Sequence, residues 1–307
     1  MDEGGIIIMS YLESLPLDAS ATFQDAWGLV WEMKFQFNAR SGYCESNRYR
    51  KHLSHSIGHL RLSDITPLLL DGLKTSLVKT GLRPKTVKHI VDLIKRIFNC
   101  LIHYNLYNGT NPASRITTPL VDNTRQRYLT KNEANMLLAT LKRKNVQLWQ
   151  ISLLSLSTGM RAGEILQLRG EHINLVERTI RIVDPKNGRN RSVYIPETAF
   201  DMLKVCPLTR GKLIFPSSRG NPYRVIPKEF IKTVNELGLN AGLPDSRDRV
   251  VFHTLRHTFA SWLVQKDQPL YVVSELLGHS TLTMTKRYAH LSSERRLKAT
   301  TILNTFI

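Results

Sequence analysis

The stretch FHTLRHTFAS, residues 252–261, is the most specific part of this chain. His253 and Arg256 stand three residues apart, so a helix places both on one face, and His257, four residues after His253, roughly shares it. Two histidines at this spacing could bind zinc, but the glutamate of the zinc-protease motif is absent and Arg256 would repel a cation. The pattern therefore argues against a metal site. An ordinary helix-entry histidine is the alternative interpretation of His253.

A second stretch, LLGHSTLTMTKRYAHL, covers residues 276–291. His279 follows Gly278, which is expected to end a helix. Tyr288 comes nine residues later, beside Lys286 and Arg287. A tyrosine among basic residues is often only a structural amphipathic side chain, so Tyr288 gains significance only together with the other stretches.

A third stretch, STGMRAGE, covers residues 157–164 and places Arg161 at a glycine-flanked turn that enters a helix. Glycines allow the backbone to approach a ligand, and a helix N-terminus favours an anion. Arg161 is therefore well placed to bind a phosphate, and Glu164 could orient its guanidinium. A local ion pair on a surface helix is the alternative.

Ordered along the chain, with Arg161 first, then His253 and Arg256, then His279 and Tyr288, the three stretches resemble the tyrosine recombinases, and phage-integrase-like members especially. The resemblance runs from about Leu129 to Leu291, and RPKTVKHIVDLIKRIF with NGTNP is more weakly similar to the family's core-binding domain. It implies a mainly α fold with a small β-hairpin or sheet (α+β). It also implies a two-domain, C-shaped clamp around DNA.

The resemblance implies a role for each residue. Arg161 and Arg256 match the two phosphate-binding arginines, and Tyr288 matches the nucleophile, which would form a 3′-phosphotyrosine and release a 5′-hydroxyl. His253 would handle the tyrosine proton. His279, at a position that is His or Trp in the family, would donate a hydrogen bond to the phosphate.

A β-hairpin is predicted from residues 179–183 and 191–195, which alternate in polarity around an Asn-Gly turn. The family's hairpin lysine, which protonates the leaving oxygen, is matched by Lys186. Arg189 and Arg191 lie close to it, so this assignment depends on the length of the hairpin.

These residue types suit phosphodiester exchange. A phenol has a pKa of about 10 and is a weak nucleophile at neutral pH, so it needs a base or a cationic field. Two arginines can hold the non-bridging oxygens and stay charged, a task that metal ions perform elsewhere. We therefore expect an enzyme that needs neither metal nor other cofactor, nor ATP.

The composition favours a polyanionic partner. The 307 residues include 43 Lys and Arg against 25 Asp and Glu, a net charge of +18. Double-stranded DNA carrying core recombination sites is the expected partner, with a membrane surface as the weaker alternative. Three cysteines without paired spacing suggest neither disulfides nor zinc, and no stretch is apolar enough for a membrane span. These features predict a cytoplasmic, nucleoid-associated bacterial protein.

Four segments are predicted: an acidic leader (1–20) that we expect to be disordered; a helical core-binding domain (21–113); a basic linker (114–128); and a catalytic domain (129–307). In the core-binding domain we expect a helix start near Ser63 and a long helix from Pro84, and Thr130 with Glu133 predicts a capping box at the start of the catalytic domain. The side chains expected to contact DNA are Arg83, Lys85, Lys88, Arg96, Arg125 and Arg127.

The end of the chain carries an apolar stripe at Leu291, Leu297, Ile302, Leu303, Phe306 and Ile307. It could pack within its own domain. The resemblance instead implies that the last helix docks into a neighbouring protomer of a DNA-bound homotetramer, and it allows accessory bending or directionality proteins.

The function expected is site-specific recombination that integrates or excises a phage or other mobile element. An Xer-like chromosome-dimer resolvase is the alternative within the family. A type IB topoisomerase and a non-catalytic DNA-binding regulator are alternatives outside it.

Overall fold

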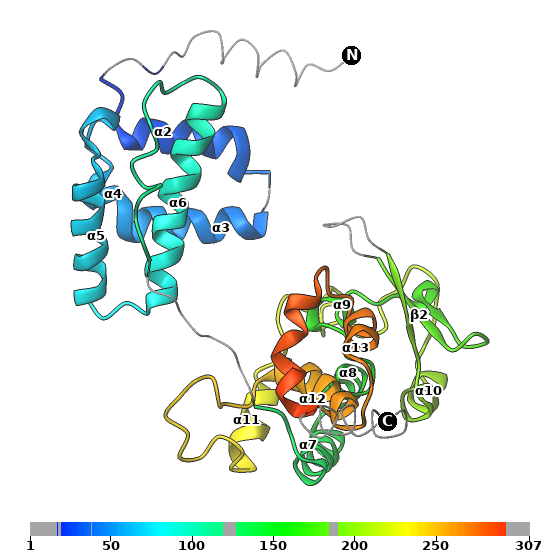
Figure 1. The fold of residues 1–307 in the computed structure, drawn as a ribbon. Coiled ribbons are helices and arrows are strands. Elements are labelled where there is room, and N and C mark those ends of the chain that lie inside the picture. Colours follow the sequence, from blue (N-terminus) through cyan, green and yellow to red (C-terminus); the bar gives the residue numbers. More distant parts are fainter. Residues whose placement is uncertain (1–16, 18–19, 38, 119–126, 184–189, 293–307) are drawn as a thin grey trace, which may run out of the picture. The chain divides into compact units, whose positions relative to one another are not determined.

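A computed structural model describes residues 17, 20–37, 39–118, 127–183 and 190–292 of the chain. The chain forms two compact units, Met1–Asp122 and Asn123–Ile307, each with its own core (Figure 1). Ile116, which the sequence analysis placed in the linker, is buried in the core of the first unit. The first unit therefore extends further along the chain than predicted.

The first unit is helical where the structure describes it. Its elements are α2 (Phe23–Val30), η1 (Trp31–Phe35), α3 (Ala39–Arg48), η2 (Tyr49–Leu53), α4 (Ser54–Ile57), η3 (Leu62–Asp64), α5 (Pro67–Lys79) and α6 (Pro84–His103).

Helix α6 is the longest element of this unit and begins at Pro84, as predicted. Proline is tolerated there because the first turn of a helix needs no donor from that nitrogen. The apolar side chains of α6 are buried against α2 and α5, among them Ile90, Ile94 and Phe98. The helix therefore forms the centre of the first core.

The predicted helix start at Ser63 is wrong. Ser63 lies in the short 3-10 turn η3, and helix α5 begins four residues after it, at Pro67. Thr66 is its cap, since its hydroxyl accepts a hydrogen bond from the backbone of Leu69 at 3.2 Å. Thr66 precedes Pro67, and a capping hydroxyl followed by proline at the first helical position starts a helix more strongly than Ser63 does.

The second unit combines helices with a small sheet. Its elements are α7 (Lys131–Lys144), α8 (Val146–Thr158), α9 (Ala162–Ile165), η4 (Gly170–His172), β1 (Ile173–Asn174), β2 (Thr179–Ile182), β3 (Arg191–Tyr194), α10 (Glu197–Lys204), α11 (Glu229–Glu236), α12 (Phe252–Gln265), α13 (Leu270–Leu277), η5 (Leu282–Met284) and η6 (Lys286–Ser292).

Helix α8 is the central helix of this unit and packs against α7, α10 and α12. Leu148, Ile151 and Leu154 of α8 are buried in the core. The capping box at the start of α7 is confirmed. The Thr130 hydroxyl accepts from the backbone of Glu133 at 3.2 Å, and the Thr130 backbone donates to the Glu133 carboxylate at 2.8 Å.

The predicted hairpin is confirmed by the antiparallel pairing of β2 with β3, in which Ile180 faces Val193. A third strand, β1, pairs with the other edge of β2. It was not predicted, because two residues carry no readable alternation. The loop that joins β2 to β3, residues 184–189, lies outside the described residues.

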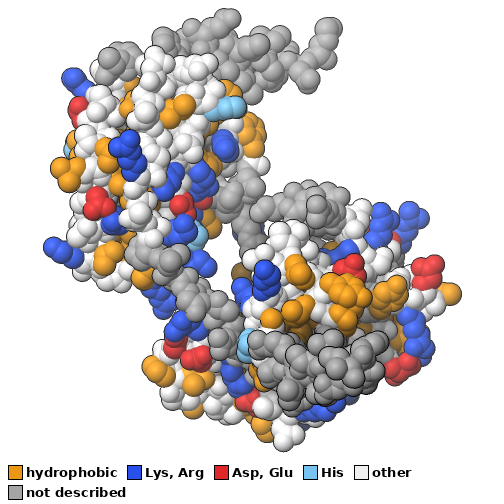
Figure 2. Space-filling model, in the orientation of Figure 1, with side chains coloured by type: hydrophobic (Ala, Val, Ile, Leu, Met, Phe, Trp, Pro, Cys, Tyr) orange, Lys and Arg blue, Asp and Glu red, His pale blue; other side chains and the backbone are white. Residues whose placement is uncertain are grey.

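Basic side chains are spread over both units, with fewer acidic ones between them, on the face that Figure 2 shows. Within the described residues, the structure contains no helix with the length and apolar character needed to span a membrane.

Candidate active site

Among the described residues of the second unit, Arg256 is the most deeply buried cation, with 3% of its surface exposed. Its Nη1 donates to the carbonyl of Gly159 at 2.6 Å, and its Nη2 donates to the carbonyl of Leu277 at 2.7 Å. These carbonyls stand at the C-terminal ends of α8 and α13, where partial negative charge gathers. Two helix ends thus hold a buried guanidinium for which the described part of the chain shows no carboxylate partner.

The charge of Arg256 is retained at neutral pH. Burial lowers the pKa of Arg256 to about 9, and the nearby charge of Arg161 contributes to the same shift. A pKa of about 9 still leaves the guanidinium protonated in neutral solution.

Gly159 makes this arrangement possible. It ends α8 with φ +68°, a left-handed conformation that favours glycine, and a Cβ there would lie 2.5 Å from the ring of Phe259. Without a side chain, the end of α8 approaches α12 closely enough for its carbonyl to reach Arg256.

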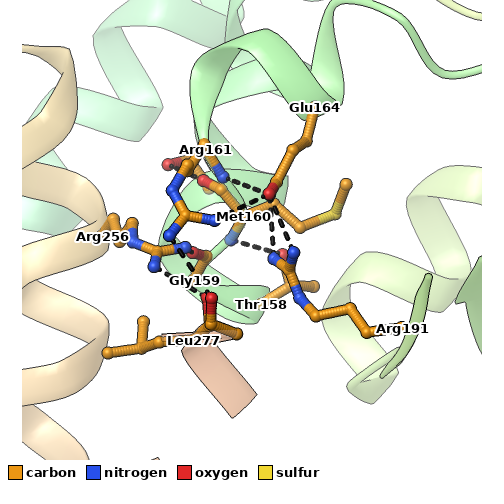
Figure 3. A network of polar contacts seen from close by, with 10 residues as sticks. Thr158, Gly159, Met160, Arg161, Glu164, Arg191, Arg256 and Leu277 are labelled. Atoms are coloured by element: carbon orange, nitrogen blue, oxygen red, sulfur yellow. Dashed lines mark hydrogen bonds and ion pairs between the residues drawn. The ribbon is translucent and has the colours of Figure 1, made fainter. Parts of the chain in front are cut away.

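Arg161 enters α9 beside this buried cation (Figure 3). Its Nη1 donates to Glu164 at 2.9 Å, and its Nη2 reaches the carbonyl of Gly278 at 3.4 Å. Glu164 also accepts from the backbone of Arg161 at 2.8 Å. The expected pairing of Glu164 with Arg161 is therefore present, and the guanidinium is about one-third exposed, which leaves it open to a ligand.

Arg191, on strand β3, completes this network (Figure 3). Its two terminal nitrogens donate to the two oxygens of Glu164 at 2.8 and 2.9 Å. Burial by itself raises the pKa of Glu164, but hydrogen bonds and charge from Arg191, and then from Arg161, outweigh it and lower the pKa below its usual value. One carboxylate thus orients two arginines from different elements.

Sequence reasoning noted Arg191 only as a neighbour of Lys186. The alternating polarity of this strand was one signal that Arg191 points inward, because Arg191 and the core residue Val193 lie on the same face of β3. Nothing local in the sequence links it to Glu164, which is 27 residues away.

His279 follows α13 and is half-buried. Its Nδ1 lies 2.7 Å from the hydroxyl of Thr285. Burial lowers the pKa of His279 to about 4, and the charges of Arg256 and Arg161 add to the shift, so the ring is neutral at neutral pH. When Thr285 donates to Nδ1, the proton of the ring resides on Nε2, which can then donate to an anion.

Tyr288 lies in the 3-10 helix η6 and is 5% exposed. Its ring packs in a cluster with Val264 of α12 and Val273 of α13. Its hydroxyl oxygen is 2.6 Å from Nδ1 of His257. Burial raises the pKa of Tyr288, partly opposed by the charges of Arg287 and Arg256, so the phenol is protonated at neutral pH.

The two histidines of α12 occupy different environments. His257 is buried and contacts Tyr288, whereas His253, one turn earlier, is exposed. Their ring centroids are 4.7 Å apart at an interplanar angle of 82°. Sequence reasoning considered His257 only as half of a zinc pair, and its contact with Tyr288 became visible only in the folded chain.

The remaining predicted residues are placed as follows. Lys186 and Arg125 lie outside the described residues. Arg83, Lys85 and Lys88 are exposed around the start of α6. Arg96 pairs with the buried Glu45 at 2.7 Å, and Arg127 pairs with Glu133. Lys88 also pairs with Asp92, at 3.6 Å. Lys88, Arg96 and Arg127 therefore already have a carboxylate partner within their own unit.

The second unit thus gathers Arg161, Arg256, Arg191 and a neutral His279 around the ends of α8 and α13, with the hydroxyl of Tyr288 within electrostatic reach of Arg256. One carboxylate, Glu164, lies among these cations. The remaining positive charge suits an oxyanion such as a phosphodiester.

Comparison with known proteins gives a consistent picture. The model of the phage integrase family matches residues 127–295. The tyrosine recombinase XerA of Pyrococcus furiosus is 27% identical over 211 residues, which cover 67% of this chain and 72% of that protein.

Two similar structures share the fold. The Tn1549 transposon integrase in complex with transposon right end DNA has a TM-score of 0.73 at 16% identity, covering 91% of this chain and 99% of that chain. A lambda integrase tetramer bound to a Holliday junction has a TM-score of 0.70 at 18% identity, covering 91% and 80%.

Proposed function

Because this chain belongs to the phage integrase family and is a site-specific DNA recombinase of the tyrosine type, we propose that it integrates or excises a mobile element through a 3′-phosphotyrosine on Tyr288. One observation carries the assignment of the site. Arg161 and Arg256 both donate to carbonyls at the end of α13, the helix from which the chain continues to Tyr288. Both cations are thereby held at the end of this helix, and the charge of Arg256 acts on the Tyr288 phenol.

In the proposed reaction, Arg161 and Arg256 bind the non-bridging oxygens of the scissile phosphate and neutralise the charge that develops on them. Nε2 of His279 donates a further hydrogen bond. The hydroxyl oxygen of Tyr288 attacks phosphorus, and the 5′-oxygen leaves. The 5′-hydroxyl of a partner strand then attacks the phosphotyrosine, so exchange requires no ATP.

Lys186 is proposed to protonate the leaving 5′-oxygen. The support is its place in the sequence, five residues before Arg191, which is anchored to Glu164. A substrate with sulfur in place of that oxygen needs no proton to leave. It should therefore restore cleavage to Lys186→Ala if the proposed role is correct.

Arg83, Lys85 and Lys88 are proposed to contact DNA, since they are exposed around the start of one helix. Contacts to phosphates should weaken binding similarly on every sequence and lower its salt dependence. Arg96 and Arg127 support this role less well, because each is paired with a carboxylate at 2.7 Å or less, whereas Lys88 lies 3.6 Å from Asp92.

A homotetramer on DNA is proposed as the working assembly, with the end of the chain docked in a neighbouring protomer. Lambda integrase, which shares the fold, forms a tetramer on a Holliday junction. Residues 293–307 lie outside the described residues, so the support is the apolar stripe of the sequence. Deleting residues 298–307 should abolish cooperative synapsis while leaving cleavage by a single protomer. Intact synapsis would contradict the docking.

The experiment that tests the enzyme is covalent trapping of DNA in cells, followed by sequencing of the attached ends. The trapped sequence is then rebuilt as a nicked duplex, on which the wild type should form an adduct and Tyr288→Phe should not. If the wild type forms none, the proposed chemistry is wrong.

The same trapped ends distinguish the two biological roles. Ends that coincide with the boundaries of an inserted element support the integrase. A single chromosomal site that lies within no element supports the alternative, an Xer-like resolvase, a role suggested by the similarity to XerA.

A further inference from the structure

The hydroxyl of Tyr288 has a specific partner in the folded chain. Its oxygen lies 2.6 Å from Nδ1 of His257, and each of the two residues is 5% exposed. We propose that His257 is the base that takes the proton of Tyr288 during cleavage and returns it during rejoining. This inference rests on the proposed function, in which Tyr288 is the nucleophile.

The distance fits direct proton transfer. A general base must lie about 2.6–3.2 Å from the atom whose proton it takes, and Nδ1 of His257 meets this requirement before any substrate is bound. Nδ1 accepts when the ring carries its proton on Nε2. The phenol then donates to Nδ1, and the same contact becomes the path of the proton.

The environment of Tyr288 makes such a base necessary. Burial raises the pKa of the phenol, and the charges of Arg287 and Arg256 only partly oppose this. A phenol with a raised pKa is almost fully protonated at neutral pH and cannot ionise without an acceptor. Water has little access to a hydroxyl in a side chain that is 5% exposed.

His253, to which the family resemblance gives this role, is placed differently. It is exposed, and its ring meets that of His257 edge to face at 4.7 Å. We therefore assign it the next position, between His257 and solvent, where its ring contact with His257 lets it influence the proton.

The charged and titratable groups around the pair come from few elements. Helix α12 packs against α8, α13 and η6, and α8 has no ionisable side chain. The other charged and titratable groups are His253 and Arg256 on α12, Tyr271 and Glu275 on α13, and Lys286, Arg287 and His290 on η6. Tyr271 and Glu275 of α13 are exposed. The proton therefore moves between Tyr288 and His257 in the field of Arg256 and Arg287.

The proposed cleavage step moves one proton to His257 and takes one from Lys186. The O–H bond of Tyr288 breaks and its proton moves to Nδ1 of His257, while the phenolic oxygen forms a bond to phosphorus. The bond between phosphorus and the 5′-oxygen breaks, and that oxygen takes a proton from the acid proposed above, Lys186. The products are a 3′-phosphotyrosine and a 5′-hydroxyl, with one proton gained by His257 and one lost by the acid.

The test uses the full chain and the nicked duplex built from trapped DNA. His257→Asn places an amide oxygen near the position of Nδ1, so it keeps a hydrogen-bond acceptor for Tyr288 but cannot take a proton. The rate of adduct formation should fall by about 10²–10⁴-fold at neutral pH. It should then rise about tenfold per pH unit, because the phenol must ionise unaided.

Two comparisons separate this role from others. A duplex with sulfur as the 5′ leaving atom should restore Lys186→Ala but not His257→Asn, since only the first lacks the leaving-group acid. His253→Gln should lose less activity than His257→Asn. DNA affinity and thermal unfolding of His257→Asn should match the wild type, which shows that the fold and binding are intact.

Several results would overturn the inference. The first is a rate of adduct formation by His257→Asn close to that of the wild type, and the second is restoration of that variant by the sulfur substrate. The third is faster cleavage by His257→Ala than by the wild type, because the contact would then restrain Tyr288 rather than activate it. If the wild type itself forms no adduct, the proposed function fails and the inference fails with it. A wild-type adduct with an unchanged variant overturns the inference alone.

Discussion

Replacing Glu164 by Gln tests whether one carboxylate holds the arginines of the site. Glu164 accepts three side-chain hydrogen bonds, one from Arg161 and two from Arg191, and its side chain is 13% exposed. Glutamine keeps one acceptor oxygen but places an NH₂ group against a guanidinium. The change therefore removes the only carboxylate contact of Arg191 among the described residues and leaves that cation buried.

The magnitude follows from the burial of each partner. Removing one member of a buried ion pair costs about 3–5 kcal/mol, and the Arg191 side chain, 17% exposed, falls in this class. Arg161 is 37% exposed, so its share is at most about 1 kcal/mol. For a unit of this size, the loss corresponds to a fall in Tm of about 6–20 °C.

The pH dependence has a defined sign. The folded-state pKa of Glu164 is lowered from 4.5, so the stabilisation is present above the unfolded pKa and is lost as the pH falls through the folded one. The wild type should therefore lose stability in acid more steeply than Glu164→Gln.

Scanning calorimetry of the full chain measures the effect on the transition of the second unit. The control is Glu197→Gln, which breaks an ion pair between side chains that are 49% and 64% exposed and should cost less than about 1 kcal/mol. Equal shifts in Tm for the two variants would refute the reasoning, because burial would then make no difference.

Three further predictions concern the same site. Gly278→Ala should lower the free energy of unfolding more than Gly238→Ala. Both glycines have positive φ, but only at Gly278 would a Cβ lie 2.6 Å from the Arg191 side chain. Equal losses of stability in urea unfolding would exclude the clash. Arg191→Lys should lower both stability and the rate of adduct formation, because an ammonium cannot donate two parallel bonds to Glu164; a wild-type cleavage rate would show that Arg191 does not support the site. His279 should titrate near pH 4 by NMR in the free protein. Between about pH 6.5 and 4 the unfolded chain then binds one more proton than the folded chain, so the free energy of unfolding should decrease as the pH is lowered through this window. A normal titration near pH 6.5 would contradict the burial argument.

Much of the fold was readable from local patterns. The start of α6 at Pro84 and the capping box of Thr130 with Glu133 depend only on residues within a turn of each other. The hairpin of β2 and β3 also follows from a local pattern, the alternating polarity of two segments that are close in the sequence. Strand β1 was not predictable, because a two-residue strand exists only through its pairing with β2.

The candidate site was readable as a list of residues but not as an arrangement. The sequence by itself determined which residues could serve the chemistry, from Arg161 through His253 and Arg256 to Tyr288, because chemical type and order are linear properties. Only the tertiary structure decided that Arg191 shares Glu164 with Arg161, since β3 and α9 meet through packing.

The same limit applies to FHTLRHTFAS, the stretch at residues 252–261. Its spacing placed His253, Arg256 and His257 near one face of a helix. Which histidine meets Tyr288 depends on how η6 packs against α12, and that packing places Tyr288 against His257 and leaves His253 exposed. Contacts between residues 31 positions apart are fixed by the core between their elements, and no local pattern encodes them.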